Sequence, residues 1–282
     1  VDDLQPLFVL IENVKNLLYC DDGKFLEEIT QEFTRMNYTI GARVLNAHAF
    51  GVPQIRERAF IAAYHSDLGI NTVTFPETTV PQIKMARQLM KDGSVPSSDL
   101  LVEYISIEEA IGDLPPLKAG ERSNHYNGAP FTDYQSARRR TAKILSNHEA
   151  RDHSEKFLHK LSKIDPGESN RDLDGRRKFD RGRTLKYFSQ AYGRLHPDGL
   201  AYTITTHFHN PGSGRFMHYR DLRSLTVREA ARLQSFDDDF IFYGTLEQQQ
   251  EHLGIAVPPL LSRRLAAHFG AVLLGARNSA IA

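Results

Sequence analysis

The first 65 residues carry three short apolar or alternating runs and one amphipathic stretch. Residues 6–11 (PLFVLI) and 59–64 (AFIAAY) are apolar runs, and residues 39–47 (TIGARVLNA) alternate as a half-buried strand does. Upstream of the alternating run, apolar side chains recur at helical spacing at Phe25, Ile29, Phe33 and Met36. The order strand, helix, strand, strand predicts an α/β fold, and we expect these strands to belong to a larger, mainly parallel sheet.

This regular pattern breaks down after about residue 71 and returns near residue 201. The intervening region is rich in Pro, Gly and charge, although Ser106 and Glu109 form a capping box that predicts a short helix. We therefore expect a second, smaller domain to interrupt the α/β domain.

The last 80 or so residues contain strong signals for one strand and two helices. Residues 201–208 (AYTITTHF) read as a strand, Thr226 and Glu229 form a second capping box, and Pro258-Pro259 open a long apolar helix. The predicted organisation has three parts: residues 1–71, 72–200 and 201–282.

The composition is that of a folded protein from a reducing compartment. The chain has 282 residues, 40% of them hydrophobic, and a single cysteine, which excludes a disulfide framework and a Cys-based zinc cluster. No apolar run approaches the ~18 residues of a membrane span, and no signal peptide is recognisable. We expect a cytoplasmic protein. The chain enters a core strand within a few residues of Val1, so we also expect an N-terminal portion to be missing from it.

Charge is unevenly distributed along a chain whose formal net charge is zero. From Tyr134 to Lys186 there are 15 Lys and Arg against 8 Asp and Glu, so the remainder is acidic by the same margin. Such a basic segment favours a surface that faces a polyanion, and it is equally typical of a solvated charged face. Charge alone does not separate the two interpretations.

Glu12 and Asn13 follow the first apolar run directly, and the only cysteine, Cys20, comes eight residues after Glu12. An acid at the carboxyl end of a strand in an open α/β sheet lies where such sheets place their sites. The same acid can merely cap a turn, and Arg56 and Arg58, which alternate before the third strand, can be solvent-facing edge charges. These residues taken singly leave both interpretations open.

Three stretches together resemble the C-terminal two-thirds of a DNA cytosine-5 methyltransferase: ENV (12–14), GVPQIRERAF (51–60) and LTVREAARLQSF…LGIAVPPLLSRRLA (225–266). They are similar to the family's Glu-Asn-Val, Gln-x-Arg-x-Arg and Gly-Asn-Ala-Val-Pro-Pro motifs. The resemblance implies a Rossmann-like, S-adenosylmethionine-dependent methyltransferase sheet with an inserted target-recognition domain. Residues 72–200 would be that domain, and the flanking parts would form the catalytic domain.

The resemblance also implies roles for the residues that match the motifs. Glu12 would protonate or hydrogen-bond N3 of a cytosine flipped out of duplex DNA, which needs a carboxyl group in a dry pocket. Arg56 and Arg58 would stabilise negative charge on the base carbonyl or the nucleotide phosphate. The residues expected to contact S-adenosylmethionine are Asn13, Val14, Gly254, Ala256 and Val257. Those expected to contact DNA are Gln54, Arg138, Arg139, Arg140, Arg176, Arg177, Lys178, Arg194 and Thr205.

Several features depart from the family pattern. Cys20 lies downstream of Glu12, whereas the family's nucleophilic cysteine follows a proline on an upstream loop, so Cys20 is predicted to be an ordinary thiol. The Pro-Cys loop and the glycine-rich cofactor loop do not occur in these residues. Ile255 stands where the family has Asn, and Asp237 replaces a usual Pro. His207 and His209 have no acid or Cys set nearby, so no metal is predicted.

The prediction is a DNA cytosine-5 methyltransferase of restriction-modification type, represented by its C-terminal portion and inactive alone. Its partners would be double-stranded DNA and a missing N-terminal segment or a partner chain that carries the Pro-Cys loop. A non-catalytic DNA-specificity subunit, or half of a split methyltransferase, is the alternative.

Overall fold

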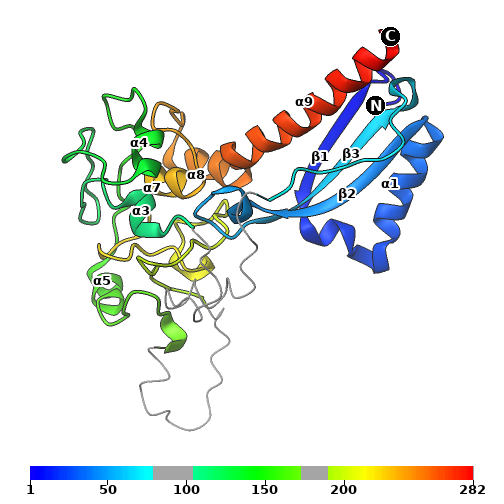
Figure 1. Ribbon diagram of the computed structural model, residues 1–282. Coiled ribbons are helices and arrows are strands. Elements are labelled where there is room, and N and C mark those ends of the chain that lie inside the picture. The colour runs from blue at the N-terminus through cyan, green and yellow to red at the C-terminus, as the bar shows by residue number, and fades with distance from the viewer. Residues whose placement is uncertain (79–103, 173–189, 282) are drawn as a thin grey trace, which may run out of the picture. The chain divides into compact units, whose positions relative to one another are not determined.

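The computed structural model describes residues 1–78, 104–172 and 190–281, which are coloured in Figure 1. The chain divides into two compact units. Unit 1 comprises Val1–Phe50, Arg56–Thr79 and Leu260–Ala282, and unit 2 comprises Gly51–Ile55 and Val80–Pro259. Residues 201–259 thus group with the middle of the chain. The functional boundaries expected at residues 71 and 200 stay a prediction.

Unit 1 is built on a three-stranded sheet in the order β1-β3-β2. The strands are β1 (Phe8–Val14), β2 (Tyr38–Asn46) and β3 (Glu57–His65), and they lie side by side in Figure 1. Both ladders are antiparallel, so β1 and β2 run parallel to each other with β3 inserted between them.

The α/β fold is confirmed, and of the three described strands only β3 departs from a parallel arrangement, while the larger, mainly parallel sheet stays a prediction. The predicted strand-helix-strand crossover exists, since α1 (Lys24–Arg35) joins the parallel pair β1 and β2. The segment from β2 to β3, residues 47–56, is shorter than the dozen or so residues that a parallel crossover needs. The chain therefore reverses and places β3 antiparallel to both neighbours.

Helices cover both faces of this sheet. On one face, Phe33 of α1 packs with Tyr38 and Ala63, and their cluster takes in Val9 and Ile11 of β1. Phe25, which shares the helical spacing, is 50% exposed and lies outside this cluster.

The opposite face of the sheet packs against the long helix α9 (Pro259–Ile281), which the sequence predicted. The ring of Phe269 lies 4.9 Å from that of Phe8 and 6.3 Å from that of Tyr64. His268 Nε2 lies 3.1 Å from Thr74 Oγ1, in the segment that follows the sheet. These aromatic contacts fix α9 against one end of β1 and β3.

Unit 2 is made of short helices and irregular segments. The predicted capping boxes at Ser106–Glu109 and Thr226–Glu229 are confirmed, and a third joins Thr245 to Gln248. Its described α-helices are α3 (Ile107–Ile111), α4 (Asp133–Arg139), α5 (Glu155–Leu161), α7 (Val227–Leu233) and α8 (Leu246–Ile255). The described 3-10 turns of the chain are Lys15–Leu18, Cys20–Gly23, Ala47–Phe50, Ser66–Leu68 and Pro211–Ser213.

The strand predicted at residues 201–208 does not form. Ala201 makes a single parallel bridge with Gln54, and the residues that follow turn away. Side chains replace the missing ladder: Gln54 Oε1 accepts from the backbone N–H of Ile204, and Thr203 Oγ1 donates to the carbonyl of Ile55. The segment is therefore anchored by amide and hydroxyl groups rather than by a neighbouring strand.

Buried ion pairs hold the centre of unit 2, where every residue of α7 is buried. Arg232 pairs with Asp113 and Asp238, with N–O distances of 3.1 and 2.6 Å. Arg223 binds Glu229 at 2.7 Å, and the pKa of that carboxyl is held below its usual range because Arg223 outweighs its burial. Removing one member of such a pair leaves a buried charge without its partner, which is strongly destabilising.

No helix in the described residues is long and apolar enough to cross a membrane.

Candidate functional site

Glu12 and Arg58 meet on one face of the sheet in unit 1. In the β1–β3 register, Glu12 pairs with Phe60 and Val14 pairs with Arg58, so Glu12 and Arg58 are diagonal neighbours. Long side chains bridge such a diagonal. Arg58 Nε lies 3.1 Å from Glu12 Oε1, and the two side chains are 16% and 26% exposed. The pair is shielded from water yet keeps an open side.

Two cations lie close to this one carboxylate. Burial lowers the pKa of the Arg58 guanidinium, and the charge of Glu12 opposes that shift. Burial and the neighbouring Arg58 lower the pKa of Arg56 to about 10, again against the pull of Glu12. Both guanidinium groups stay protonated at neutral pH, so the cluster carries net positive charge. Such a cluster can hold an anionic or carbonyl oxygen while offering a carboxyl group to a ring nitrogen.

The backbone at Arg56 is fixed by the end of β2. Asn46 Oδ1 accepts the N–H of Arg56 at 3.1 Å, and the carbonyl of Arg56 accepts the N–H of Ala47 at 2.9 Å. The side chain of Arg56 is almost fully buried. Neither arginine is thus a solvent-facing edge charge, while their catalytic roles stay a prediction.

Asn13 and Val14, expected to contact the cofactor, lie exposed at the end of β1. Asn13 Oδ1 accepts the N–H of Val14 at 2.8 Å. Beside them, Lys15 pairs with Glu57 of β3 at 2.6 Å. The open end of β1 leaves both residues accessible to a ligand.

The other cofactor candidates, Gly254, Ala256 and Val257, lie at the end of α8 in unit 2. A Cβ on Gly254 would lie 2.6 Å from the carbonyl carbon of Thr205, so only glycine permits this close backbone approach. Ala256 and Val257 are half-buried, and Ile255 between them and Gly254 is 63% exposed. The position where the family carries an amide is therefore an open apolar surface here.

Gln54, expected to contact DNA, lies in the interior of unit 2. Its side chain is fully buried, and its Nε2 lies 3.4 Å from the Leu233 carbonyl and 3.5 Å from Gln234 Oε1. With Oε1 occupied by Ile204, the amide is engaged on both sides. Direct DNA contact by Gln54 stays a prediction, while the geometry favours an internal role.

The arginine triplet on and after α4 divides by exposure. Arg138 is buried, donates to the Ser235 carbonyl at 2.7 Å and pairs with Asp237 at 2.9 Å. Arg139 pairs with Asp113 at 2.8 Å and its guanidinium lies 4.0 Å from the centre of the Tyr126 ring. Arg140 also pairs with Asp237, yet 54% of its side chain is exposed. Of the triplet, Arg140 offers the most accessible guanidinium to a phosphate.

Arg194 and Thr205 complete the described DNA candidates. Arg194 is buried, and its guanidinium donates to the carbonyls of Ile164, His218 and Tyr219. Thr205 Oγ1 accepts the N–H of His207 at 3.4 Å on a half-buried turn. Three further candidates, Arg176, Arg177 and Lys178, lie outside the described residues.

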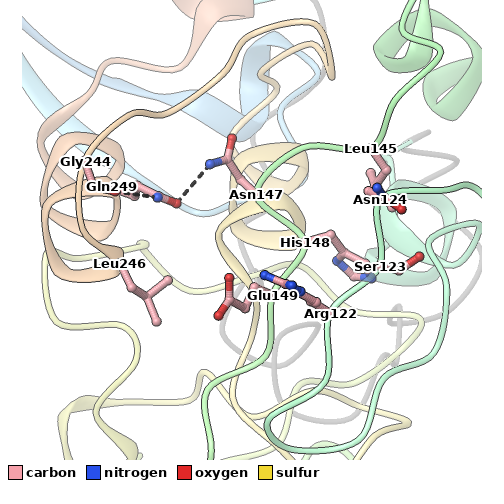
Figure 2. Close-up of a pocket in the computed structure, with 10 residues that line it drawn as sticks. All are labelled: Arg122, Ser123, Asn124, Leu145, Asn147, His148, Glu149, Gly244, Leu246 and Gln249. Atoms are coloured by element: carbon pink, nitrogen blue, oxygen red, sulfur yellow. Dashed lines mark hydrogen bonds between the residues drawn. The ribbon is translucent and has the colours of Figure 1, made fainter.

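A polar pocket of about 690 Å³ lies within unit 2, where no motif predicted one. Figure 2 shows the Asn147 amide aimed at Gln249, to which it donates at 2.9 Å. Asn147 also binds Phe242 through both its carbonyl oxygen and its amide, and His148 is tied to Thr226 and Pro115. Much of the polar lining is thus committed to the protein itself. The lining residues are Arg122, Ser123, Asn124, Leu145, Asn147, His148, Glu149, Gly244, Leu246 and Gln249.

Cys20 lies exposed in the 3-10 turn that precedes α1. In the described part of the chain, no group of three or more His, Cys, Asp or Glu side chains could hold a metal ion.

Gln234 was not among the residues expected at the site, yet its buried side chain joins two backbone carbonyls. Its Nε2 donates to the carbonyls of Leu253 and Ala256. In the sequence, it is indicated only by its place directly after the buried helix α7.

Comparison with known proteins gives consistent matches. Residues 1–271 match the C-5 cytosine-specific DNA methylase family. The chain is 35% identical to the type II methyltransferase M1.HphI of Haemophilus parahaemolyticus, over 93% of this chain and 56% of that protein. It is 32% identical to the type II methyltransferase M.DdeI of Desulfomicrobium norvegicum, over 93% and 62%. The chain thus spans somewhat more than half the length of these relatives.

A solved structure supports the same fold. A prophage-encoded E. coli protein, proposed to be a DNA modification methyltransferase, superposes with a TM-score of 0.67 at 20% identity. The match covers 97% of this chain and 71% of that one.

Proposed function

The chain belongs to the C-5 cytosine-specific DNA methylase family, and from that premise we propose that it carries the base-activating and DNA-recognising parts of a methyltransferase. The reaction would move a methyl group from S-adenosylmethionine to carbon 5 of a cytosine in duplex DNA, in a restriction-modification setting. The observation that carries this proposal is the Glu12–Arg58 pair, 3.1 Å apart and largely shielded on one sheet face.

Glu12 would act on N3 of the cytosine. Carbon 5 is a poor nucleophile until a thiolate adds to carbon 6, and the added electron density must then be met by a proton or hydrogen bond at N3. Arg58 holds the Glu12 carboxyl in place and presents a fixed cation beside it. Negative charge that develops on the base carbonyl would be stabilised by Arg58 and Arg56 without reorganisation.

S-adenosylmethionine, when bound, supplies the methyl group. The segment from Gly254 to Val257 would contact an apolar part of it, because the side chains of Ile255 and Val257 present an apolar surface. The nearby amide of Gln234 donates to two backbone carbonyls and adds no free polar group there. We place the rest of the cofactor pocket on sequence beyond these 282 residues.

The nucleophile would also come from elsewhere. Cys20 is the single cysteine of the chain, and it stands exposed in a turn outside the Glu12 cluster. We propose that a further segment or a partner chain supplies a Pro-Cys loop, and that the 282 residues alone do not transfer methyl groups. A pure DNA-specificity subunit is the alternative, but it has no use for a shielded carboxylate beside two guanidinium groups.

Duplex DNA would be held by the basic middle of the chain, with Arg140 as the most accessible member of its triplet. Phosphate contacts of this kind make affinity fall with salt and carry no sequence information. DNA as substrate would place the protein at the nucleoid if its source is bacterial.

Two assays test this function. Filter binding should show salt-dependent binding of duplex DNA by the 282 residues, and labelled S-adenosylmethionine should give no methylated product with them alone. Methylation should appear when the chain is completed by the sequence that carries the Pro-Cys loop. Methyl transfer by the isolated chain would refute the proposal that another segment or a partner chain supplies the nucleophile. A completed protein that binds DNA without methylating it would favour the alternative, a non-catalytic DNA-specificity subunit.

A further inference from the structure

Two buried glutamines join four separate segments of unit 2. Gln54 accepts the N–H of Ile204 through Oε1, and its Nε2 reaches the Leu233 carbonyl and Gln234 Oε1 at 3.4 and 3.5 Å. Gln234 in turn donates its Nε2 to the carbonyls of Leu253 and Ala256 at 2.9 and 2.8 Å. The Gln54–Gln234 relay therefore runs from the turn before β3 to the end of α8.

Each amide in the relay has one usable orientation. The Gln234 amide nitrogen donates both of its hydrogens to backbone carbonyls, so the amide oxygen of Gln234 faces the amide nitrogen of Gln54. Rotating either amide would set donor against donor and leave carbonyl groups unpaired in a fully buried place. The relay therefore specifies the path of the backbone at Leu253 and Ala256, and an apolar side chain of the same size cannot.

We propose that Gln54 and Gln234 are positioning residues for S-adenosylmethionine, acting through the Gly254–Val257 segment. This inference rests on the proposed function. Close packing of Gly254 against Thr205 supports it, because the segment that Gln54 anchors at Ile204 is the surface on which Gly254 lies. Loss of either amide would let the Gly254–Val257 segment shift while the Glu12 cluster, which belongs to unit 1, keeps its own contacts.

The test compares Gln234→Leu and Gln54→Leu with a matched control, Gln135→Leu. Gln135 is also fully buried and also ties two backbone groups, the Phe131 N–H and the Glu108 carbonyl, but neither of these partners belongs to the relay or to the Gly254–Val257 segment. In the completed enzyme, we expect each relay variant to raise KM for S-adenosylmethionine about tenfold with kcat little changed, because a misplaced segment weakens binding in ground and transition states alike. The control should leave KM unchanged.

A second readout uses the 282 residues alone. Amide hydrogen exchange of peptides covering residues 253–258 should be faster in both relay variants and unchanged in Gln135→Leu. The double variant should behave like either single one, because the two amides act as a unit.

Equal KM shifts in the relay variants and the control would overturn the proposal, as would unchanged exchange at residues 253–258. If the wild-type completed protein transfers no methyl group, the proposed function fails, and the exchange experiment alone decides whether the relay positions this segment.

Discussion

Glu12 of β1 and Arg58 of β3 lie diagonally across one antiparallel ladder, with 3.1 Å between Oε1 and Nε. The arrangement depends on β3 lying directly beside β1, because this register places Arg58 diagonally across from Glu12. The reversal of the chain after β2 thus assembles the carboxylate and the cation from residues that are 46 positions apart in the sequence.

Replacing Arg58 by Gln should lower kcat/KM for methyl transfer by about 10²–10³ in the completed enzyme, since a fixed cation at developing charge is lost. Arg35→Gln is the control, because Arg35 is an exposed partner of Glu32 on α1. Steady-state kinetics with duplex DNA measures the effect. Equal kcat/KM values for the two variants would show that Arg58 does not stabilise the transition state of methyl transfer.

Gly254→Ala should destabilise unit 2 by roughly 1–3 kcal/mol, because the new methyl group meets the backbone of Thr205. Gly270→Ala is the matched control: Gly270 lies within α9, and nothing lies within 4 Å of an added Cβ there. Alanine in a helix interior should be neutral or stabilising by about 0.5–1 kcal/mol. Urea unfolding measures the free energy of unfolding of both variants. A Gly254→Ala protein as stable as wild type would contradict the close approach of Gly254 to the backbone of Thr205.

Arg138 and Arg140 should behave oppositely despite standing two residues apart. Arg140→Gln should reduce the slope of log K against log salt for DNA binding by about one and leave stability within about 0.5 kcal/mol. Arg138→Gln should instead cost roughly 1–3 kcal/mol of stability, because the buried Ser235 carbonyl loses its donor while Asp237 keeps its pair with Arg140. DNA binding titrated over salt, together with urea unfolding, measures both. An unchanged salt slope for Arg140→Gln would exclude it as a phosphate contact.

Acid should weaken unit 2 through His218. Burial lowers the pKa of His218 to about 4, Glu229 opposes that shift, and Nδ1 already accepts the N–H groups of Arg220 and Asp221. The unfolded chain takes up a proton near pH 6.5 while the folded protein does not, so stability is complete above that pH and is lost as pH falls toward 4. The loss is on the order of 3 kcal/mol.

His218→Gln should flatten this part of the curve of unfolding free energy against pH, while His125→Gln, at an exposed position, should leave it unchanged. Chemical denaturation at a series of pH values measures the difference. An identical slope between pH 6.5 and 4 in wild type and His218→Gln would show that another group is responsible.

Local features of the fold followed from the sequence, because they depend on neighbouring residues. The capping boxes at Ser106 and Thr226 and the helix after Pro258 formed as predicted. The position of β3 and the loss of the strand at residues 201–208 did not follow, since both depend on which distant segment supplies the hydrogen bonds.

The candidate site shows the same division. The motif residues Glu12 and Arg58 came together without any contact being visible in the sequence. Arg138 and Gln54 look like surface residues in the sequence, and only the folded chain shows that Asp237 and Ile204, each about 100 or more positions away, take up their polar groups. Burial of a polar residue depends on such remote partners, so pattern and composition could not predict it.

The most direct test of the account is methyl transfer by the completed enzyme carrying Glu12→Gln, beside Glu57→Gln as a matched control. Glu57 is a half-exposed β3 carboxylate whose partner is Lys15. Glu12→Gln should lower kcat by about 10²–10⁴ while duplex DNA is bound as in wild type, because general acid catalysis at N3 is lost. Glu57→Gln should be nearly as active as wild type. Full activity of Glu12→Gln would contradict the claim that this carboxylate activates the base.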